Sequence, residues 1–145
     1  MDEIHILKPN DGHIKEIERI HLSHFQQIGQ VEGEIASYLK RPENLTLIST
    51  DKDGVVTGYL ISANYGTQNY FEWFAVSKKR QGIAQALFNE YLKELKLLKM
   101  TSSALASRNR FKDAIIFYLK SGYEIKGVNL ANDGDLMINL KLSLT

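Results

Sequence analysis

The sequence predicts an α/β (α+β) fold, with a central mixed, twisted sheet of about six or seven strands and about four helices. Three observations predict it. β-rich runs and runs with helical spacing follow one another in the order βααβββαβαββ. Two tight reversals, DKDG and NDGD, each join two neighbouring β-rich runs. One helical run separates two β-rich runs, and such a crossover makes the strands on either side of it parallel.

The first part of the chain predicts a short strand and two helices. The strand covers Ile4 to Leu7 and is stopped by a proline and turn residues. Apolar residues then recur three and four apart over 14–25, which is typical of an amphipathic helix, with Asp11 as its N-cap. A second helix covers Val31 to Leu39. It ends before Pro42, because the residue preceding a proline avoids the helical region.

Three consecutive antiparallel strands are predicted next. The runs LTLIST (45–50) and VVTGYLISANYG (55–66) flank the turn DKDG, which favours a hairpin. A third run, from Tyr70 to Ser77, follows GTQN. Adjacent strands joined by such short turns pair in antiparallel fashion.

A helix and a strand complete the crossover. Helical spacing resumes from Ala84 to Leu98, and the strand candidate TSSALAS (101–107) follows. The strand near Leu105 is therefore expected to run parallel to the strand near Phe74. Ligands tend to bind at the carboxyl ends of such strands.

The chain ends with a helix and a hairpin. The helix covers Lys112 to Lys120 and is ended by Gly122. Two strands, Tyr123–Leu130 and Leu136–Leu142, then surround the turn NDGD.

The composition is that of a soluble globular protein. The 145 residues contain no proline- or glycine-rich linker and no repeat, so a single domain over residues 1–145 is expected. With 18 basic and 17 acidic residues, the net charge of +1 argues against a nucleic-acid partner and a polybasic membrane surface. No signal-peptide pattern or membrane-spanning run is present, so no membrane association and a cytoplasmic location are expected.

Metal and thiol chemistry are not predicted. The sequence has no cysteine, which excludes disulfides, thiolate metal sites and cysteine nucleophiles. His21, His24 and Glu18 fall on adjoining helical turns, but no further ligand has a recognisable spacing. The two histidines are therefore interpreted as solvated or core side chains.

The stretch KKRQGIAQAL, from Lys78 to Leu87, runs from the end of a strand into a helix. If the helix starts near Gly82, the amides of Gln81 to Ala84 lack helical partners and point beyond the helix end. Gly82 allows the backbone to approach an anion closely, while Lys79 and Arg80 add positive charge. The phosphate-loop motifs GxxxxGK[ST] and GxGxxG are absent. On the residues alone, a diphosphate site and a solvated basic turn both remain open.

Two motifs resemble those of the GNAT superfamily of N-acetyltransferases. KRQGIA, residues 79–84, matches the family pattern [RQ]-x-x-G-x-[GA], with lysine in the first position. AIIFYLKSGYEI, residues 114–125, matches A-x-x-[LF]-Y-x-x-x-G-[FY]. The predicted order of elements also matches the family's fold over nearly the whole chain.

The resemblance implies acetyl-CoA as the acetyl-donating cosubstrate and no metal. In the family, loop amides hold the pyrophosphate and the pantetheine arm runs beside the preceding strand. The cofactor-binding residues implied in this way are Phe74, Ala75, Val76, Lys79, Arg80, Gln81, Gly82, Ile83, Ala84 and Gln85.

Two positions depart from the family pattern. The family valine lies eight residues before the glycine, so either Phe74 replaces it or Val76 fills its role before a shorter loop. The family asparagine three residues before Ala114 is Phe111 here, and Asn109 is expected to substitute for it.

Tyr118 is the expected general acid. It falls on the tyrosine of the second motif, which in the family lies near the thioester sulfur and can protonate the departing CoA thiolate. A phenol with a pKa of ~10 is protonated at neutral pH and can still donate a proton. On the residues alone, Tyr118 shares a helical face with Phe111 and Ala114 and is more simply a core residue; the resemblance favours the acid.

Glu72 is the expected base that removes the proton of the attacking amine. Strict alternation along YFEWFAV predicts two opposite faces, with Tyr70, Glu72, Phe74 and Val76 on one and Phe71, Trp73 and Ala75 on the other. Apolar neighbours would raise the pKa of the Glu72 carboxyl, which suits a base. Tyr70 and an ordered water are the alternative bases.

These residues predict direct transfer of an acetyl group from acetyl-CoA to a primary amine within one ternary complex. The acceptor is a small molecule or a peptide, and polar residues in the segment Gln26–Glu34 hint at a cationic amine. A homodimer is expected from its frequency in the family. Two alternatives remain: a non-catalytic acyl-CoA-binding or interaction module, which would bind CoA without turnover, and another type of nucleotide-binding α/β domain, which ATP would stabilise.

Overall fold

The computed structural model describes residues 3–77 and 82–145 and confirms the predicted order of elements. Two short 3-10 turns, Asp11–His13 and Gln26–Ile28, flank the first helix. The strands and helices are β1 (His5–Leu7), α1 (Ile14–Phe25), α2 (Glu34–Leu39), β2 (Asn44–Thr50), β3 (Val56–Tyr65), β4 (Gln68–Val76), α3 (Ile83–Leu97), β5 (Ser102–Arg108), α4 (Lys112–Lys120), β6 (Glu124–Leu130) and β7 (Leu136–Ser143).

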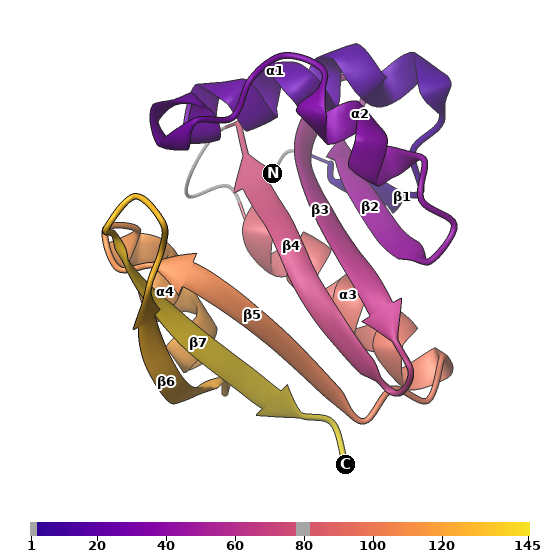
Figure 1. Cartoon of the computed structure of the whole chain (residues 1–145). Helices are drawn as coiled ribbons and strands as arrows, with labels where there is room; N and C mark the ends of the chain where they lie inside the picture. Colours follow the sequence, from indigo (N-terminus) through magenta and orange to yellow (C-terminus); the bar gives the residue numbers. More distant parts are fainter. Residues whose placement is uncertain (1–2, 78–81) are drawn as a thin grey trace.

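The strands form one mixed sheet in the order β1-β2-β3-β4-β5-β7-β6 (Figure 1). Strands β4 and β5 are paired in parallel, and the other neighbours are antiparallel. The parallel pair is the one predicted from the crossover helix, α3. The mixed sheet is therefore confirmed.

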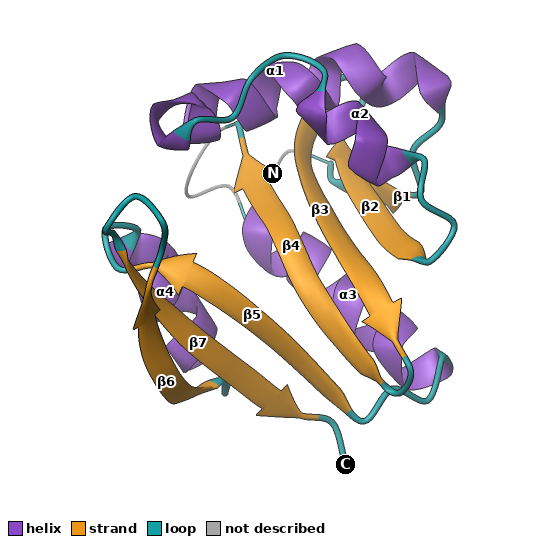
Figure 2. Ribbon diagram, viewed as in Figure 1, coloured by secondary structure: helices purple, strands orange, loops and turns teal. Residues whose placement is uncertain are grey.

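The helices cover the two faces of the sheet unequally (Figure 2). Helices α3 and α4 pack on one face, over a core that includes Leu87, Tyr91, Leu105 and Leu140. Helices α1 and α2 pack on the other face, over a smaller core around Tyr59. In the described part of the chain, no helix is long and apolar enough to cross a membrane.

Strands β4 and β5 separate along their length. They pair from Gln68 opposite Ser102 to Phe71 opposite Leu105, and no pairing continues beyond these residues in the described chain. Each strand goes on alone, β4 still paired with β3 and β5 still paired with β7. The two strands visibly diverge towards the end where α1 and α4 lie (Figure 1).

A β-bulge in β4 overturns the predicted alternation. Ile61 of β3 pairs with Trp73 and the next residue, Ser62, pairs with Phe71, so Glu72 is the extra residue. The rings of Phe71 and Phe74 then lie 5.5 Å apart in the core beneath α3 and α4. Phe74 and Phe71 therefore share a face, and the prediction that placed them on opposite faces was wrong.

Two helix starts also differ from the predictions. Asn10, not Asp11, caps the first helical segment: its side chain accepts from the Gly12 amide at 2.9 Å, and the His13 ring accepts from the Asn10 amide at 3.0 Å. Helix α2 begins at Glu34 rather than Val31, because Gly33 precedes it in a left-handed conformation. The backbone must turn there before the helix can start.

Candidate active site

A groove of about 810 Å³ lies where β4 and β5 separate. Four segments line it: the end of α1, the end of β4, the start of α3 and the start of α4. The lining residues are Ser23, His24, Phe25, Gln27, Phe74, Ala75, Val76, Gly82, Ile83, Ala84, Gln85, Arg110, Phe111, Lys112, Asp113, Ala114 and Phe117. Seven of the residues implied as cofactor-binding are among them, so the structure brings these together.

The start of α3 presents amides to this groove. Its first intrahelical bond runs from the Ala86 amide to the Gly82 carbonyl at 3.0 Å, so the amides of Ile83, Ala84 and Gln85 precede it. No acidic residue lies in the first turn. Gly82 itself has a φ of 75°, a left-handed conformation that favours glycine, and apart from its chain neighbours no described residue lies within 4 Å of where its Cβ would stand. The helix dipole and the first-turn amides favour an anion here. The predicted partners Lys79, Arg80 and Gln81 lie outside the described residues.

The start of α4 forms the opposite wall. Lys112 donates to the Asn109 side chain at 2.7 Å, and Arg110 donates to Asp135 at 2.6 Å. Asp113 in the first turn places a negative charge on this wall. The start of α3, in contrast, carries no acidic residue in its first turn. Asn109 itself is not among the residues that line the groove, and its cofactor role stays a prediction.

Tyr118 lies under the groove rather than in its lining. It is buried, and its ring packs 5.8 Å from those of Phe71 and Tyr123. Burial raises the pKa of the Tyr118 phenol well above its usual value, with a smaller contribution from Tyr123. The phenol is thus protonated throughout the neutral range, as an acid must be.

The hydroxyl of Tyr118 differs from those of its neighbours. Tyr123 and Tyr91 both contact the Ser103 hydroxyl, at 2.7 and 2.6 Å, and Tyr91 also donates to Asn69. Within residues 3–77 and 82–145, the Tyr118 hydroxyl has no hydrogen-bond partner. Its donor capacity is therefore uncommitted in the described part of the protein.

Glu72 occupies the bulge of β4, half-buried and outside the groove lining. Burial raises the pKa of its carboxyl, and the positive charge of Arg41 opposes this shift. Burial also raises the pKa of the alternative base, Tyr70, and the charge of Glu72 adds to that shift. Arg41 stacks 4.6 Å above the ring of Tyr38, which places Glu72 towards the end of α2.

The sequence did not predict the contact between two aromatic rings that line the groove. Phe25 at the end of α1 and Phe111 before α4 both line the groove, and their rings meet edge to face at 5.9 Å. This contact joins the α1 layer to the half of the molecule that carries α4. The one signal available for Phe111 was its place where the family pattern has asparagine.

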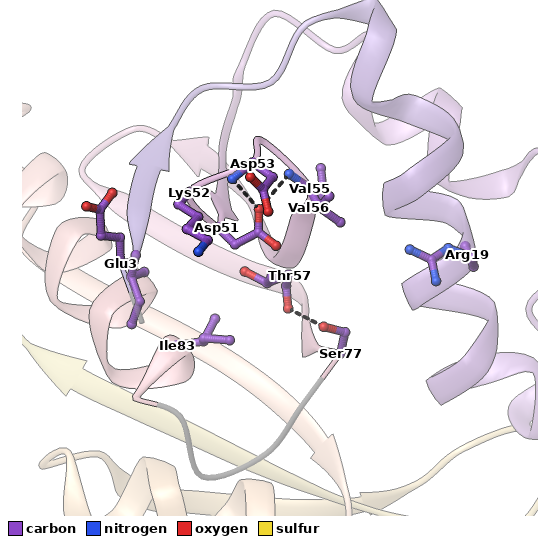
Figure 3. Close-up of a pocket in the computed structure, with 11 residues that line it drawn as sticks. Glu3, Arg19, Asp51, Lys52, Asp53, Val55, Val56, Thr57, Ser77 and Ile83 are labelled. Atoms are coloured by element: carbon purple, nitrogen blue, oxygen red, sulfur yellow. Dashed lines mark hydrogen bonds between the residues drawn. The ribbon is translucent and has the colours of Figure 1, made fainter. Parts of the chain in front are cut away.

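A second cavity, of about 470 Å³, lies near the turn between β2 and β3 (Figure 3). Charges of both signs surround it: Glu3, Asp51 and Asp53 against Arg19 and Lys52. The Asp51 carboxylate is occupied by the Asp53 and Val55 amides, at 2.9 and 3.0 Å. Among the described residues, Ile83 is the one that this cavity shares with the predicted site, so the larger groove is the candidate active site. Among the described residues, no group of three or more histidine, cysteine or carboxylate side chains is placed to hold a metal.

Comparisons with known proteins agree with this geometry. Residues 13–144 match the family model of the acetyltransferase (GNAT) domain. A search of curated protein sequences finds no significant match.

Solved structures share the fold at low sequence identity. The ribosomal-protein-S18-alanine N-acetyltransferase from Escherichia coli is 18% identical, with a TM-score of 0.84 over 99% of this chain and 95% of that one. Ard1 from Thermoplasma volcanium is 21% identical, with a TM-score of 0.85 over 98% of both chains. An aminoglycoside 6'-N-acetyltransferase, solved in complex with coenzyme A, is 15% identical, with a TM-score of 0.82 over 99% of this chain and 97% of that one.

The resemblance inferred from the two sequence motifs is confirmed by the family model, which spans most of the sequence, and by these folds. The chain therefore belongs to the GNAT family of acetyltransferases.

Proposed function

We propose that this acyltransferase moves the acetyl group of acetyl-CoA directly to a primary amine, with both substrates bound at once. One observation carries the proposal: the groove opens where β4 and β5 separate, and in the described residues it contains both the unpaired edge of β4 and the first-turn amides of α3. A strand edge with unpaired backbone groups can hold an amide-bearing chain, and helix amides can hold a phosphate.

The groove fits the chemical parts of acetyl-CoA. Ile83, Ala84 and Gln85 would hold the pyrophosphate through their amides, in the helix turn that has no acidic residue. Phe74, Ala75 and Val76 would offer their backbone edge to the pantetheine arm. Lys79, Arg80 and Gln81 are proposed as further phosphate partners on the motif alone.

Bound acetyl-CoA would supply an acetyl group on a thioester, with a thiolate as the leaving group. Tyr118 would donate its proton to that sulfur, and the raised pKa of its phenol keeps the proton in place until it is needed. Glu72 would accept the proton of the amine. The raised pKa of its carboxyl makes it a stronger base than an exposed glutamate, although it ionises at a higher pH.

The acceptor is proposed to be a small-molecule or peptide amine. Two similar structures are named for such acceptors, one for an alanine of a ribosomal protein and one for aminoglycosides. In this chain, the Asp133 and Asp135 carboxylates near the β6–β7 turn are paired with Arg108 at 2.6 and 2.8 Å, and Asp135 is also paired with Arg110 at 2.6 Å. These two carboxylates are thus already neutralised, and the surface carries no excess charge there for a polycation.

The remaining proposals concern the state of the protein. We propose that residues 1–145 act as a single domain, that the protein is cytoplasmic and that it forms a homodimer. The edge strand β6 supports the last point, because Ile125, Val128 and Leu130 are 52%, 59% and 71% exposed. Light scattering of the purified chain would show a mass near 33 kDa for a dimer, twice the 16.5 kDa of one chain.

Thermal unfolding with acetyl-CoA, CoA or ATP tests the cosubstrate, and a panel of amines followed by detection of free thiol tests the reaction. Acetyl-CoA and CoA are expected to raise the unfolding temperature and ATP is not, and at least one amine is expected to release thiol. No shift with either CoA compound would overturn the proposal. A shift without turnover on any amine would identify a non-catalytic acyl-CoA-binding module, and stabilisation by ATP alone would identify another nucleotide-binding domain.

A further inference from the structure

A buried histidine lies where the α1 wall of the groove meets the sheet, and the proposed transfer does not use it. His21 of α1 has no exposed surface. Its Nδ1 lies 2.6 Å from the Tyr59 hydroxyl of β3, and its Nε2 lies 2.9 Å from Oε1 of Gln30, which follows α1. Since both ring nitrogens are engaged and the ring is buried, His21 cannot itself reach an amine.

These two contacts define the neutral form of the ring. The Gln30 oxygen can only accept, so Nε2 must carry a hydrogen. The neutral imidazole then has a lone pair on Nδ1, which accepts from the Tyr59 hydroxyl. A second proton, on Nδ1, would face the Tyr59 oxygen and force its buried hydroxyl hydrogen to find another acceptor. The buried arrangement is therefore fully bonded only while His21 is neutral.

The ring also packs against other aromatic rings. It lies 5.1 Å from the ring of Phe25 and 4.7 Å from that of Trp73, perpendicular to the latter. Phe25 lines the groove and meets Phe111 on its opposite side. His21 is thus in contact with a residue that lines the groove, Phe25.

His21 anchors the chain that follows α1 as well. This chain turns at Gly29, with a φ of 95°, and returns so that the Gln30 amide donates to the Phe25 carbonyl at 3.3 Å. Gln27, within the turn, lines the groove. One helical turn earlier, Glu18 holds the same connection at an exposed point, by accepting from the Gly33 amide at 2.9 Å. Of these two anchors from α1, the one at His21 is the less exposed.

We propose that neutral His21 is a positioning residue for acetyl transfer: by joining Tyr59, Gln30 and Phe25 it sets the α1 wall of the groove, and its protonation at low pH loosens that wall and weakens the binding of acetyl-CoA. The inference rests on the proposed function, because it places acetyl-CoA in this groove.

The charges around His21 agree with a neutral ring. Burial lowers its pKa below 6.5; the Gln30 hydrogen bond and the charges of Glu34 and Glu18 oppose this shift, while His24 adds to it. The Tyr59 phenol, which faces Nδ1, has a pKa raised well above its usual value by burial, so it remains a donor. Because the folded state disfavours the proton, the stability contributed by neutral His21 is present above pH 6.5 and is lost as the pH falls through the lowered pKa.

The affinity for acetyl-CoA between pH 5 and 8, measured by calorimetry on the full chain, tests this inference. His21→Gln keeps one donor and one acceptor but cannot titrate, and His5→Gln on β1 is the control because His5 is an exposed histidine remote from the groove. Lowering the pH from about 8 to about 5 is expected to weaken the binding of acetyl-CoA by the unchanged protein and by His5→Gln. Their loss of affinity should be about fivefold larger than the loss in His21→Gln. Nitrogen-resolved NMR of the imidazole is expected to show the Nε2–H tautomer of His21 at pH 7.

The outcomes separate the two proposals. Binding by the unchanged protein with the same pH dependence in His21→Gln, or a tautomer protonated on Nδ1, would overturn the role of His21 and leave the proposed function standing. No binding of acetyl-CoA by the unchanged protein at any pH would overturn both. A fall in unfolding temperature in His21→Gln without a change in the pH profile would mean that the ring only stabilises the fold, which also contradicts the proposal.

Discussion

The paired and the separated stretches of β4 differ in how their polar groups are satisfied. Beside the paired stretch, a buried chain of hydrogen bonds runs from Tyr123 through Ser103 and Tyr91 to Asn69. On the separated stretch itself, the buried Nε1 of Trp73 has no partner among the described residues. Buried polar groups are normally bonded, so unused ones are informative. The paired end of this strand pair is expected to stabilise the fold, and the separated end is the one proposed to bind substrates.

The largest effect on acetyl-CoA affinity is expected from a substitution at Gly82, which precedes α3. Gly82→Asp should raise the dissociation constant for acetyl-CoA about 100-fold, because it places a negative charge and a strained backbone beside the proposed phosphate position. Gly66→Asp is the matched control, since Gly66 also has a left-handed backbone (φ 64°) and open space but lies in the β3–β4 turn. Calorimetry on both variants measures the difference. Equal affinities in the two variants would place the phosphates elsewhere.

Tyr118 and Tyr91, which differ in the hydrogen bonding of their hydroxyls, provide a second test. Tyr118→Phe should lower kcat about 100-fold and change the free energy of unfolding by less than about 0.5 kcal/mol, because its hydroxyl holds no bond in the described structure. Tyr91→Phe should do the reverse, with kcat retained and a loss of about 1–3 kcal/mol, because it leaves buried partners unsatisfied. Steady-state kinetics and urea unfolding of both variants provide the comparison. If Tyr118→Phe keeps its rate, Tyr118 is a core residue only.

The pH dependence of the activity distinguishes between Glu72 and Tyr70 as the base. Glu72→Gln should lower kcat about tenfold and abolish the acid limb of the kcat/KM profile. In the unchanged protein, activity needs the carboxylate and therefore rises with pH through a value above 4.5, the direction in which burial shifts the pKa of Glu72. If Tyr70 were the base, the rise would instead come above pH 10, since its pKa is raised from 10.0. Full pH profiles of the unchanged protein, Glu72→Gln and Tyr70→Phe decide between them.

The smallest expected effect is at Trp73. Trp73→Phe removes a buried N–H that has no partner in the described residues, and this gain offsets the packing contacts that are lost. The free energy of unfolding should therefore change by less than about 1 kcal/mol, a smaller change than in Tyr91→Phe. Urea unfolding of the two variants side by side measures this. A loss in Trp73→Phe equal to that in Tyr91→Phe would contradict the contrast between the two ends.

The sequence allowed the order of the elements, the parallel pair and one wall of the groove to be predicted. Gly82 and the amides after it could be found because a glycine before a helix is a local signal, whereas Phe74 to Val76 were implied by the family resemblance. Both Phe74 and Val76 line the groove, so both readings of the family valine place a side chain there.

The other features depend on contacts between distant segments. The bulge at Glu72 arises from pairing with β3, and alternation within β4 alone gives no sign of it. The contact between Phe25 and Phe111 joins segments 86 positions apart. The bonding of His21 requires β3 and the connection after α1 to meet around one ring. Composition and spacing do not determine such long-range contacts.

The bulge also places the residues of a single strand in two different cores. Because it shifts the alternation by one position, Phe71 and Phe74 belong to the core under α3 and α4, while Trp73 and Ala75 belong to the core under α1 and α2. Glu72, between them, is committed to neither core. A substitution at this position is therefore expected to leave the packing of both layers unchanged, so its effect on the catalytic rate can be measured apart from any effect on the cores.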